Sequence, residues 1–401
     1  MTVGVTPEQV RQWREDTPGC AHVAHFNNAG AALQPAPVID TVIGHLRLEQ
    51  QLGGYEAAER AAAPSADVPA LLARLVRAED ASEIAIIENA TRAWDMAVYS
   101  IPFAPGEVIV TGVAEYASNY LAFLQLSQRL GVQVQVCRDD DAGQLDLEHL
   151  ESLLASNPVR VVSITHVPTN GGLVNPALEV GRMARANGAL FVLDACQSIG
   201  QLDLDVQALG CDFLSATSRK FLRGPRGIGF LYARGSSTGT FEPPFIDVHA
   251  ATWLGQTDFE WQPGAKRFEN WESNVASRLG LGEAVRYAMD IGLPVITARV
   301  QSLADHLRGS LAAIPGITVQ DKGKVRCGIV TFTHAAVPPS AIREALQAEG
   351  INTSISPRTS TRLDLDARGL DALNRASVHY YNTDEEVDRL AHVVRRTVDQ
   401  A

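Results

Sequence analysis

Two residues that flank one apolar strand carry the chemistry that this sequence can be expected to perform. Lys220 stands in "SATSRKFLRGPRGIG", and Asp194 ends the apolar run in "ALFVLDA". A carboxylate at the end of a buried strand is costly unless a partner balances its charge. Because neighbouring parallel strands end at one edge of a sheet, we expect the two side chains to lie side by side. Such a pair suits a pyridine aldehyde, since the carboxylate keeps the ring nitrogen protonated and the lysine forms a Schiff base.

A second motif supplies an anion site. In "ENATRAWDMAV" a strand ends, and Asn89, Ala90 and Thr91 open a helix. Free backbone amides and a hydroxyl at a helix N-terminus bind phosphate, although the same residues also serve as ordinary helix caps. Together with the lysine and the carboxylate, this motif indicates pyridoxal 5'-phosphate (PLP) as the cofactor.

Composition narrows the class of protein. The chain has 401 residues and a net charge of -12, which argues against nucleic acid as the main partner. It shows no secretory signal pattern and no apolar stretch of bilayer length, so we expect a cytoplasmic enzyme that does not bind membranes. The cysteines are scattered, and we interpret the cluster of Cys20, His22 and His25 as a strand entry, with no metal site expected.

Apolar runs alternate with helical patterns along most of the chain. This alternation predicts an α/β fold with a mostly parallel sheet of seven strands that is covered on both faces. After about residue 290 the pattern changes to that of a smaller C-terminal α+β domain with an antiparallel sheet. We therefore divide the chain into an N-terminal segment (1–20), a large PLP-binding domain (21–290) and a small domain (291–401). The expected strands of the large domain are 84–88, 108–112, 132–137, 159–167, 189–195, 213–217 and 228–233.

The order of the polar motifs resembles one known family. The motifs "NAT", "EYASN", "THVPTNGG", "DACQSIG", "SATSRKFLRGPRGIG" and "RASVHYYNTDEEVDRL" are similar to those of the class V aminotransferases, which are PLP-dependent enzymes of fold type I. That family includes cysteine desulfurases, isopenicillin N epimerase-like proteins, kynureninase and the C–S lyase of ergothioneine synthesis. The resemblance covers nearly the whole chain and implies a homodimer.

The resemblance also implies roles for individual residues at the cofactor. Lys220 would form the Schiff base, and Asp194 would pair with the pyridine nitrogen. Tyr116 would stack on the ring, where many members have a histidine. The remaining cofactor contacts would be Gln197 and Thr169 near the phenolic oxygen, and Ala90, Thr91, Thr217 and Arg219 at the phosphate.

At the substrate, the resemblance implies that Arg375 grips the carboxylate of an amino acid through a bidentate pair. Asn28 and Tyr55 are further candidates for substrate contact, although Tyr55 is equally well explained by packing at a helix start. Arg358 and Arg362 belong to the segment before the arginine motif, where they suit a polar or anionic substrate tail.

One departure from the family decides the expected subtype. Cysteine desulfurases carry a catalytic cysteine in the segment that here reads "SISPRTSTRLDLDARGLDALN", which contains none. We therefore expect α-proton removal from an external aldimine followed by β-elimination, as in a C–S lyase, and not a persulfide-forming desulfurase. The alternatives are an amino acid epimerase and a class V aminotransferase.

Overall fold

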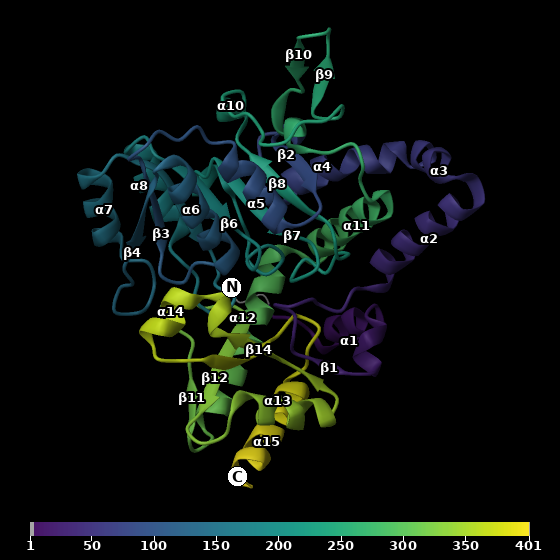
Figure 1. Cartoon of the computed structure of the whole chain (residues 1–401). Coiled ribbons are helices and arrows are strands. Elements are labelled where there is room, and N and C mark those ends of the chain that lie inside the picture. The colour runs from purple at the N-terminus through teal and green to yellow at the C-terminus, as the bar shows by residue number, and fades with distance from the viewer. Residues whose placement is uncertain (1–3, 401) are drawn as a thin grey trace.

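The structure is a computed structural model, and it describes residues 4–400 apart from the side chain of Ser237. Its large domain is built on the predicted seven-stranded sheet (Figure 1). The strand order is β2-β8-β7-β6-β5-β3-β4, and only β8 runs against its neighbours. All predicted strands are confirmed: β2 (Ile84–Ile87), β3 (Val108–Gly112), β4 (Gln133–Cys137), β5 (Val159–Thr165), β6 (Leu190–Asp194), β7 (Phe213–Thr217) and β8 (Gly229–Ala233).

Both faces of this sheet are buried, because successive residues of each strand point to opposite sides. In β2, Ile84 and Ile86 join one apolar core, whereas Ala85 and Ile87 join a second core on the other face. The helices of the first face are α2 (Ala36–Leu52), α4 (Ala62–Val76), α7 (Leu147–Ser156), α8 (Ala177–Ala186), α9 (Val206–Leu209) and α11 (Val275–Ile291), and those of the second are α5 (Ala90–Tyr99) and α6 (Ala117–Leu130).

The predicted small domain is present below the large one, with its chain drawn in green and yellow in Figure 1. Its four-stranded sheet has the order β11-β12-β15-β14, and every pair in it is antiparallel. Its elements are α12 (Leu293–Ala312), β11 (Ile317–Val319), β12 (Ile329–His334), α13 (Pro339–Ala348), β13 (Ile351–Asn352), β14 (Ser354–Pro357), η4 (Arg358–Ser360), α14 (Arg362–Ala367), β15 (Ala372–Ser377) and α15 (Asp384–Asp399).

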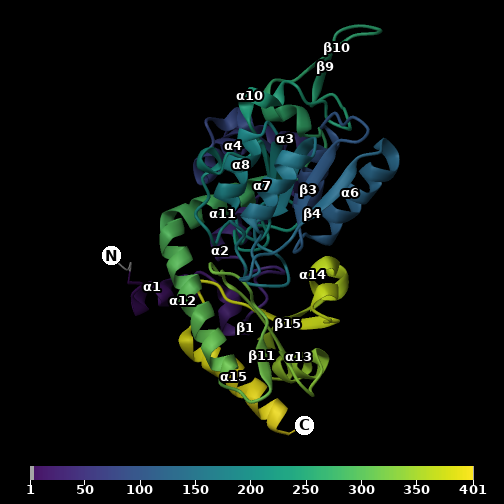
Figure 2. The same ribbon diagram turned by 90° about the vertical axis from the view of Figure 1, so that its left-hand side faces the viewer.

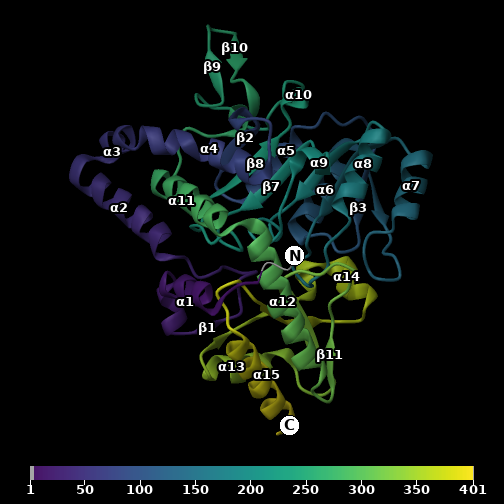
Figure 3. The same ribbon diagram turned by 180° about the vertical axis from the view of Figure 1, so that it is seen from behind.

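The N-terminal segment packs on the small domain, as Figure 3 shows from behind. It contains α1 (Pro7–Glu15), η1 (Pro18–Ala21) and β1 (Ala24–His25). β1 pairs in parallel with β13, and the guanidinium of Arg14 lies 2.9 Å from the carboxylate of Glu386. Residues 24–25 therefore adjoin the small domain, whereas the division made from the sequence assigned them to the large one.

The segment between β8 and α11 is mostly irregular, as its proline and aromatic content indicates. It contains α10 (Gly235–Thr238), η3 (Gly264–Phe268) and a hairpin of β9 (Ala251–Trp253) and β10 (Phe259–Trp261). The hairpin projects from the top of the large domain (Figure 2). α2 and α3 (Gly54–Arg60) form an arm at the side of that domain in Figure 1, and the turn η2 (Ala81–Glu83) leads into β2. Among the helices that the structure describes, none has the length and apolarity needed to cross a membrane.

Arg223 fastens the N-terminal segment to the loop that follows the predicted active-site lysine. Its backbone adopts a left-handed conformation with φ of 61°, and its side chain is buried. The guanidinium donates hydrogen bonds to the carbonyl of Leu33 (2.8 Å), the hydroxyl of Thr17 (2.6 Å) and the hydroxyl of Tyr380 (2.5 Å). It also lies 4.5 Å from the centre of the Tyr381 ring. One cation thus ties three separate parts of the chain together.

We expect Arg223→Ala to lower the free energy of unfolding by about 3 kcal/mol or more, because it leaves buried acceptors without a donor and removes a cation–π contact. The change can be measured as the shift of the urea unfolding curve. Arg226→Ala is a matched control, since this exposed arginine stands three residues further on and its loss should change stability by less than about 0.5 kcal/mol. Equal effects of the two substitutions would contradict the role of Arg223.

Candidate active site

The carboxyl ends of the central strands surround a cavity of about 250 Å³. Ligands of open α/β sheets bind at this edge, where strand ends meet helix N-termini. The cavity is lined by residues from β5, β6, β7, α5 and α6 and from the loops that follow these strands. Every residue that the sequence assigned to the cofactor is among them, namely Ala90, Thr91, Tyr116, Thr169, Asp194, Gln197, Thr217, Arg219 and Lys220.

Asp194 and Lys220 meet at this edge because β6 and β7 are neighbours, with Asp194 opposite Ser215 in the register. The carboxylate of Asp194 is held in place by Asn119 Nδ2, at 3.0 Å, and by the backbone amide of Cys196, at 2.9 Å. Burial raises the pKa of Asp194 above its usual range, because it disfavours the charged carboxylate. A cationic partner such as a protonated pyridine would stabilise that charge.

Lys220 is 8% exposed, and burial lowers the pKa of its amine below the usual value. The amine of a buried lysine loses its proton more readily than an exposed one, and only the neutral amine is nucleophilic. The structure thus gives Lys220 the environment that attack on an aldehyde requires.

Within the described part of the chain, the side-chain amide of Gln197 has one atom that lacks a hydrogen-bond partner, which indicates a polar ligand beside it. Its Nε2 donates to the carbonyl of Ala29 (3.1 Å) and to Oγ1 of Thr169 (3.4 Å). Its Oε1 is buried and has no hydrogen-bond partner among the residues that the structure describes. Buried polar atoms are rarely left unpaired in a native protein. A polar ligand in the cavity, such as PLP, fits this unmet requirement.

Another part of the cavity wall is formed by the start of α5. Asn89 caps this helix, because its side chain accepts a hydrogen bond from the amide of Arg92 at 3.0 Å. The helix start is oriented with Ala90 and Thr91 lining the cavity, and Thr217 at the end of β7 lines it as well. The capping role and the anion site are therefore compatible, and the positive end of the helix dipole lies where a phosphate is expected.

Two residues that support the site were not singled out from the sequence. Glu115 precedes the start of α6 and Asn119 lies in its first turn, and Asn119 Nδ2 is 2.9 Å from Glu115 and 3.0 Å from Asp194. Glu115 also accepts hydrogen bonds from the hydroxyls of Thr111 and Thr165. Burial raises the pKa of Glu115 to about 7, and the charge of Asp194 contributes to that shift. The sequence offered one signal for these residues, their spacing of four positions after a strand end. That spacing does not reveal that Asn119 contacts Asp194.

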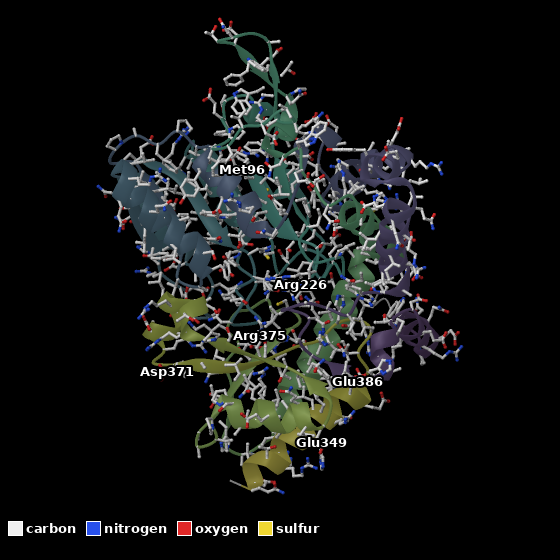
Figure 4. The ribbon with its side chains drawn as sticks, turned by 45° about the vertical axis from the view of Figure 1, so that its right-hand side comes forward. Met96, Arg226, Glu349, Asp371, Arg375 and Glu386 are labelled. Atoms are coloured by element: carbon white, nitrogen blue, oxygen red, sulfur yellow. The ribbon has the colours of Figure 1, made fainter. Side chains whose placement is uncertain are left out.

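Arg375 reaches the site from β15 of the small domain, and Figure 4 shows it where that domain faces the large one. Its guanidinium donates to Oγ1 of Thr169 (2.7 Å), the carbonyl of Thr169 (3.0 Å) and Oγ of Ser354 (3.0 Å). All of these acceptors are neutral. Burial, and secondarily the charge of Arg219, lowers the pKa of Arg375 to about 10. An anion beside this guanidinium would offset both its burial and the repulsion from Arg219.

The structure places the other predicted substrate residues away from this cavity. Asn28 is fully buried and bonded within the fold, to the carbonyl groups of His25 and Ser377 and to the hydroxyl of Tyr381. The remaining three lie at the surface: Tyr55 is 78% exposed on α3, and Arg358 and Arg362 both pair with Asp366. None of the four lines the cavity.

The fold and the paired Asp194 and Lys220 define a PLP-dependent enzyme of fold type I. The model of the family "Aminotransferase class-V" matches residues 24–390, and the chain therefore belongs to this family.

Its relatives are named as cysteine desulfurases. It is 31% identical over 381 residues to a cysteine desulfurase of Synechococcus elongatus, covering 92% of this chain and 60% of that relative. It is 27% identical to a probable cysteine desulfurase of Methanothermobacter thermautotrophicus, covering 95% and 96%. The apo structure of the cysteine desulfurase from Thermococcus onnurineus NA1 superposes with a TM-score of 0.91 at 26% identity, over 100% of both chains.

These relatives show that the expectation of a C–S lyase that does not form a persulfide is wrong. The expectation rested on the missing cysteine in residues 354–374. Both reactions break the bond between Cβ and sulfur, and they differ in whether a thiol takes the sulfur. The absence removes one acceptor within the chain, but it does not exclude an acceptor outside this segment, which does not line the cavity.

Proposed function

We propose that this protein removes sulfur from cysteine in a PLP-dependent reaction and passes it to a thiol. Cysteine and a thiol together give alanine and a hydropersulfide, so that atoms and electrons balance without an added oxidant or reductant. The observation that carries the proposal is the match to cysteine desulfurases over almost the whole chain, in a site whose lysine and carboxylate suit PLP. With no cysteine in residues 354–374, the proposed acceptor is a thiol from solution.

PLP, when bound, withdraws electrons from the α carbon of an amino acid. The residues of this chain do the rest. Asp194 would balance the positive charge of a protonated ring nitrogen, and Asn119 donates the hydrogen bond that positions this carboxylate. Arg375 orients the substrate by its carboxylate. The amine of Lys220, whose pKa is lowered by burial, is placed to take the α proton and to return it.

The test is to incubate the holoenzyme with l-cysteine and excess dithiothreitol and to measure the products. We expect alanine and sulfide in equal amounts, and neither in the Lys220→Ala variant. Pyruvate and ammonia in place of alanine, or no turnover of cysteine at all, would overturn the proposal.

A homodimer is part of the same proposal. Large apolar side chains are exposed along the segment that contains the projecting hairpin, where Trp253 is 79% exposed, Val248 72% and Leu254 62%. Exposed apolar patches of this kind mark protein interfaces. Light scattering should give twice the chain mass of 43.1 kDa, and Trp253→Ser together with Leu254→Ser should weaken the association. A monomer at all concentrations would contradict it.

The expected cytoplasmic location stays a prediction.

A further inference from the structure

One turn, residues 27–31, supplies acceptors to three polar side chains at or beside the cavity. The turn is closed by hydrogen bonds from the amides of Gly30 and Ala31 to the carbonyl of Asn27, both at 3.0 Å. A Cβ atom at Gly30 would lie 2.6 Å from the side-chain oxygen of Asn27, so a larger residue there would displace that side chain. The turn thus holds Asn27 and Gly30 close together.

Three side chains bind successive parts of this turn. Arg375 Nη2 lies 3.5 Å from Oδ1 of Asn27, Gln197 Nε2 donates to the carbonyl of Ala29 at 3.1 Å, and Arg219 Nη1 donates to the carbonyl of Gly30 at 2.9 Å. Both arginines therefore contact the same turn. Arg219 lines the cavity from the loop after β7, next to Lys220, and Arg375 donates hydrogen bonds to Thr169, which also lines the cavity.

Neither guanidinium forms an ion pair with a carboxylate among the residues that the structure describes. Arg219 has the carbonyl of Gly30, and Arg375 has hydroxyl, carbonyl and amide oxygens. The two cations are close enough for Arg219 to lower the pKa of Arg375. Bringing two cations together without an anion is costly. One carboxylate of a substrate would satisfy only one of them.

We propose that Arg219 is a specificity residue that binds an anionic group on the side chain of the substrate, while Arg375 binds the α-carboxylate. The substrate class is an α-amino acid whose short side chain carries an anion, such as a thiolate, a carboxylate or a sulfinate. This assignment rests on the proposed function for the role of Arg375. It gives Arg219 a task different from the phosphate contact that the family resemblance implies. The residues left for the phosphate are Ala90 and Thr91 at the start of α5 and Thr217 at the end of β7, all of which line the cavity.

The experiment compares two amino acids of the same shape that differ in side-chain charge. The holoenzyme is titrated with l-aspartate and with l-asparagine, and binding is followed by the cofactor absorbance. A charge-assisted contact should make the wild type bind aspartate about ten-fold more tightly or better. Arg219→Gln should bring this ratio close to one, and Arg219→Lys should retain part of it. Arg226→Gln, which removes an exposed positive charge seven residues further on, should leave the ratio unchanged.

The dissociation constant of PLP is measured for the same variants. The proposal requires that Arg219→Gln change PLP affinity by less than about three-fold. It is overturned if the wild type does not distinguish the two amino acids. It is also overturned if Arg219→Gln keeps the preference for aspartate and loses PLP affinity, since Arg219 would then be a phosphate ligand. Failure of the proposed function would show separately, as an absence of alanine from cysteine while the preference for aspartate persists.

Discussion

Lys220→Ala is expected to lower the turnover of cysteine by about 10³-fold or more, because it removes the residue proposed both to attach the cofactor and to act as the base for the α proton. The visible absorbance band of the lysine-bound cofactor should disappear as well. The rate is measured as alanine formed per minute at saturating PLP. Lys220 is buried in the cavity wall, and no other lysine lines the cavity. No second lysine is therefore placed to take over its role.

Lys266→Ala is the matched control, because this exposed lysine lies outside the cavity in the connection between β10 and α11. It should keep the absorbance band and the rate of the wild type. A Lys220→Ala protein that retained a tenth or more of the wild-type rate would show that another group abstracts the proton.

Asp194→Asn is expected to reduce turnover by about 10²-fold or more while PLP still binds. The amide keeps the shape and the hydrogen bond to the amide of Cys196, but it cannot balance the charge of a protonated ring nitrogen in a buried site. The ring is then a weaker electron sink. The measurement is kcat for cysteine together with the dissociation constant of PLP.

Two further variants separate charge from position. Asp290→Asn removes an exposed carboxylate at the end of α11 and should leave kcat unchanged. Asn119→Ala leaves the charge of Asp194 but removes the group that positions it, so its kcat should fall less than that of Asp194→Asn. A kcat of the wild-type value in Asp194→Asn would mean that the ring nitrogen needs no anionic partner.

Much of the fold could be predicted from the sequence because the sheet is buried on both faces. Strands such as β6 and β7 are continuous apolar runs, and their polar ends mark the edge where the site forms. The pairing of β1 with β13 could not be predicted, since these short strands are joined only through contacts between residues more than 300 positions apart.

Some residues of the site could likewise be predicted from the sequence, and others could not. Asp194, Lys220 and the start of α5 stand at strand and helix ends, so their types and order revealed them. The hydrogen bond from Asn119 to Asp194 spans 75 positions, and the placement of Arg219 against Gly30 spans 189. Such contacts depend on how loops pack, which no local pattern records. For Tyr55, on α3, the sequence left substrate contact and packing at a helix start equally open, and the structure places its side chain exposed and outside the cavity lining.

PLP attached to Lys220 is the basis of the proposed function, and peptide mapping detects that attachment. The holoenzyme is reduced with borohydride, digested and analysed by mass spectrometry for the pyridoxyl phosphate label. We predict that the label lies on the peptide that contains Lys220, with none on the peptides that contain Lys266, Lys322 or Lys324. A label on any of those three lysines, or none at all, would contradict the account.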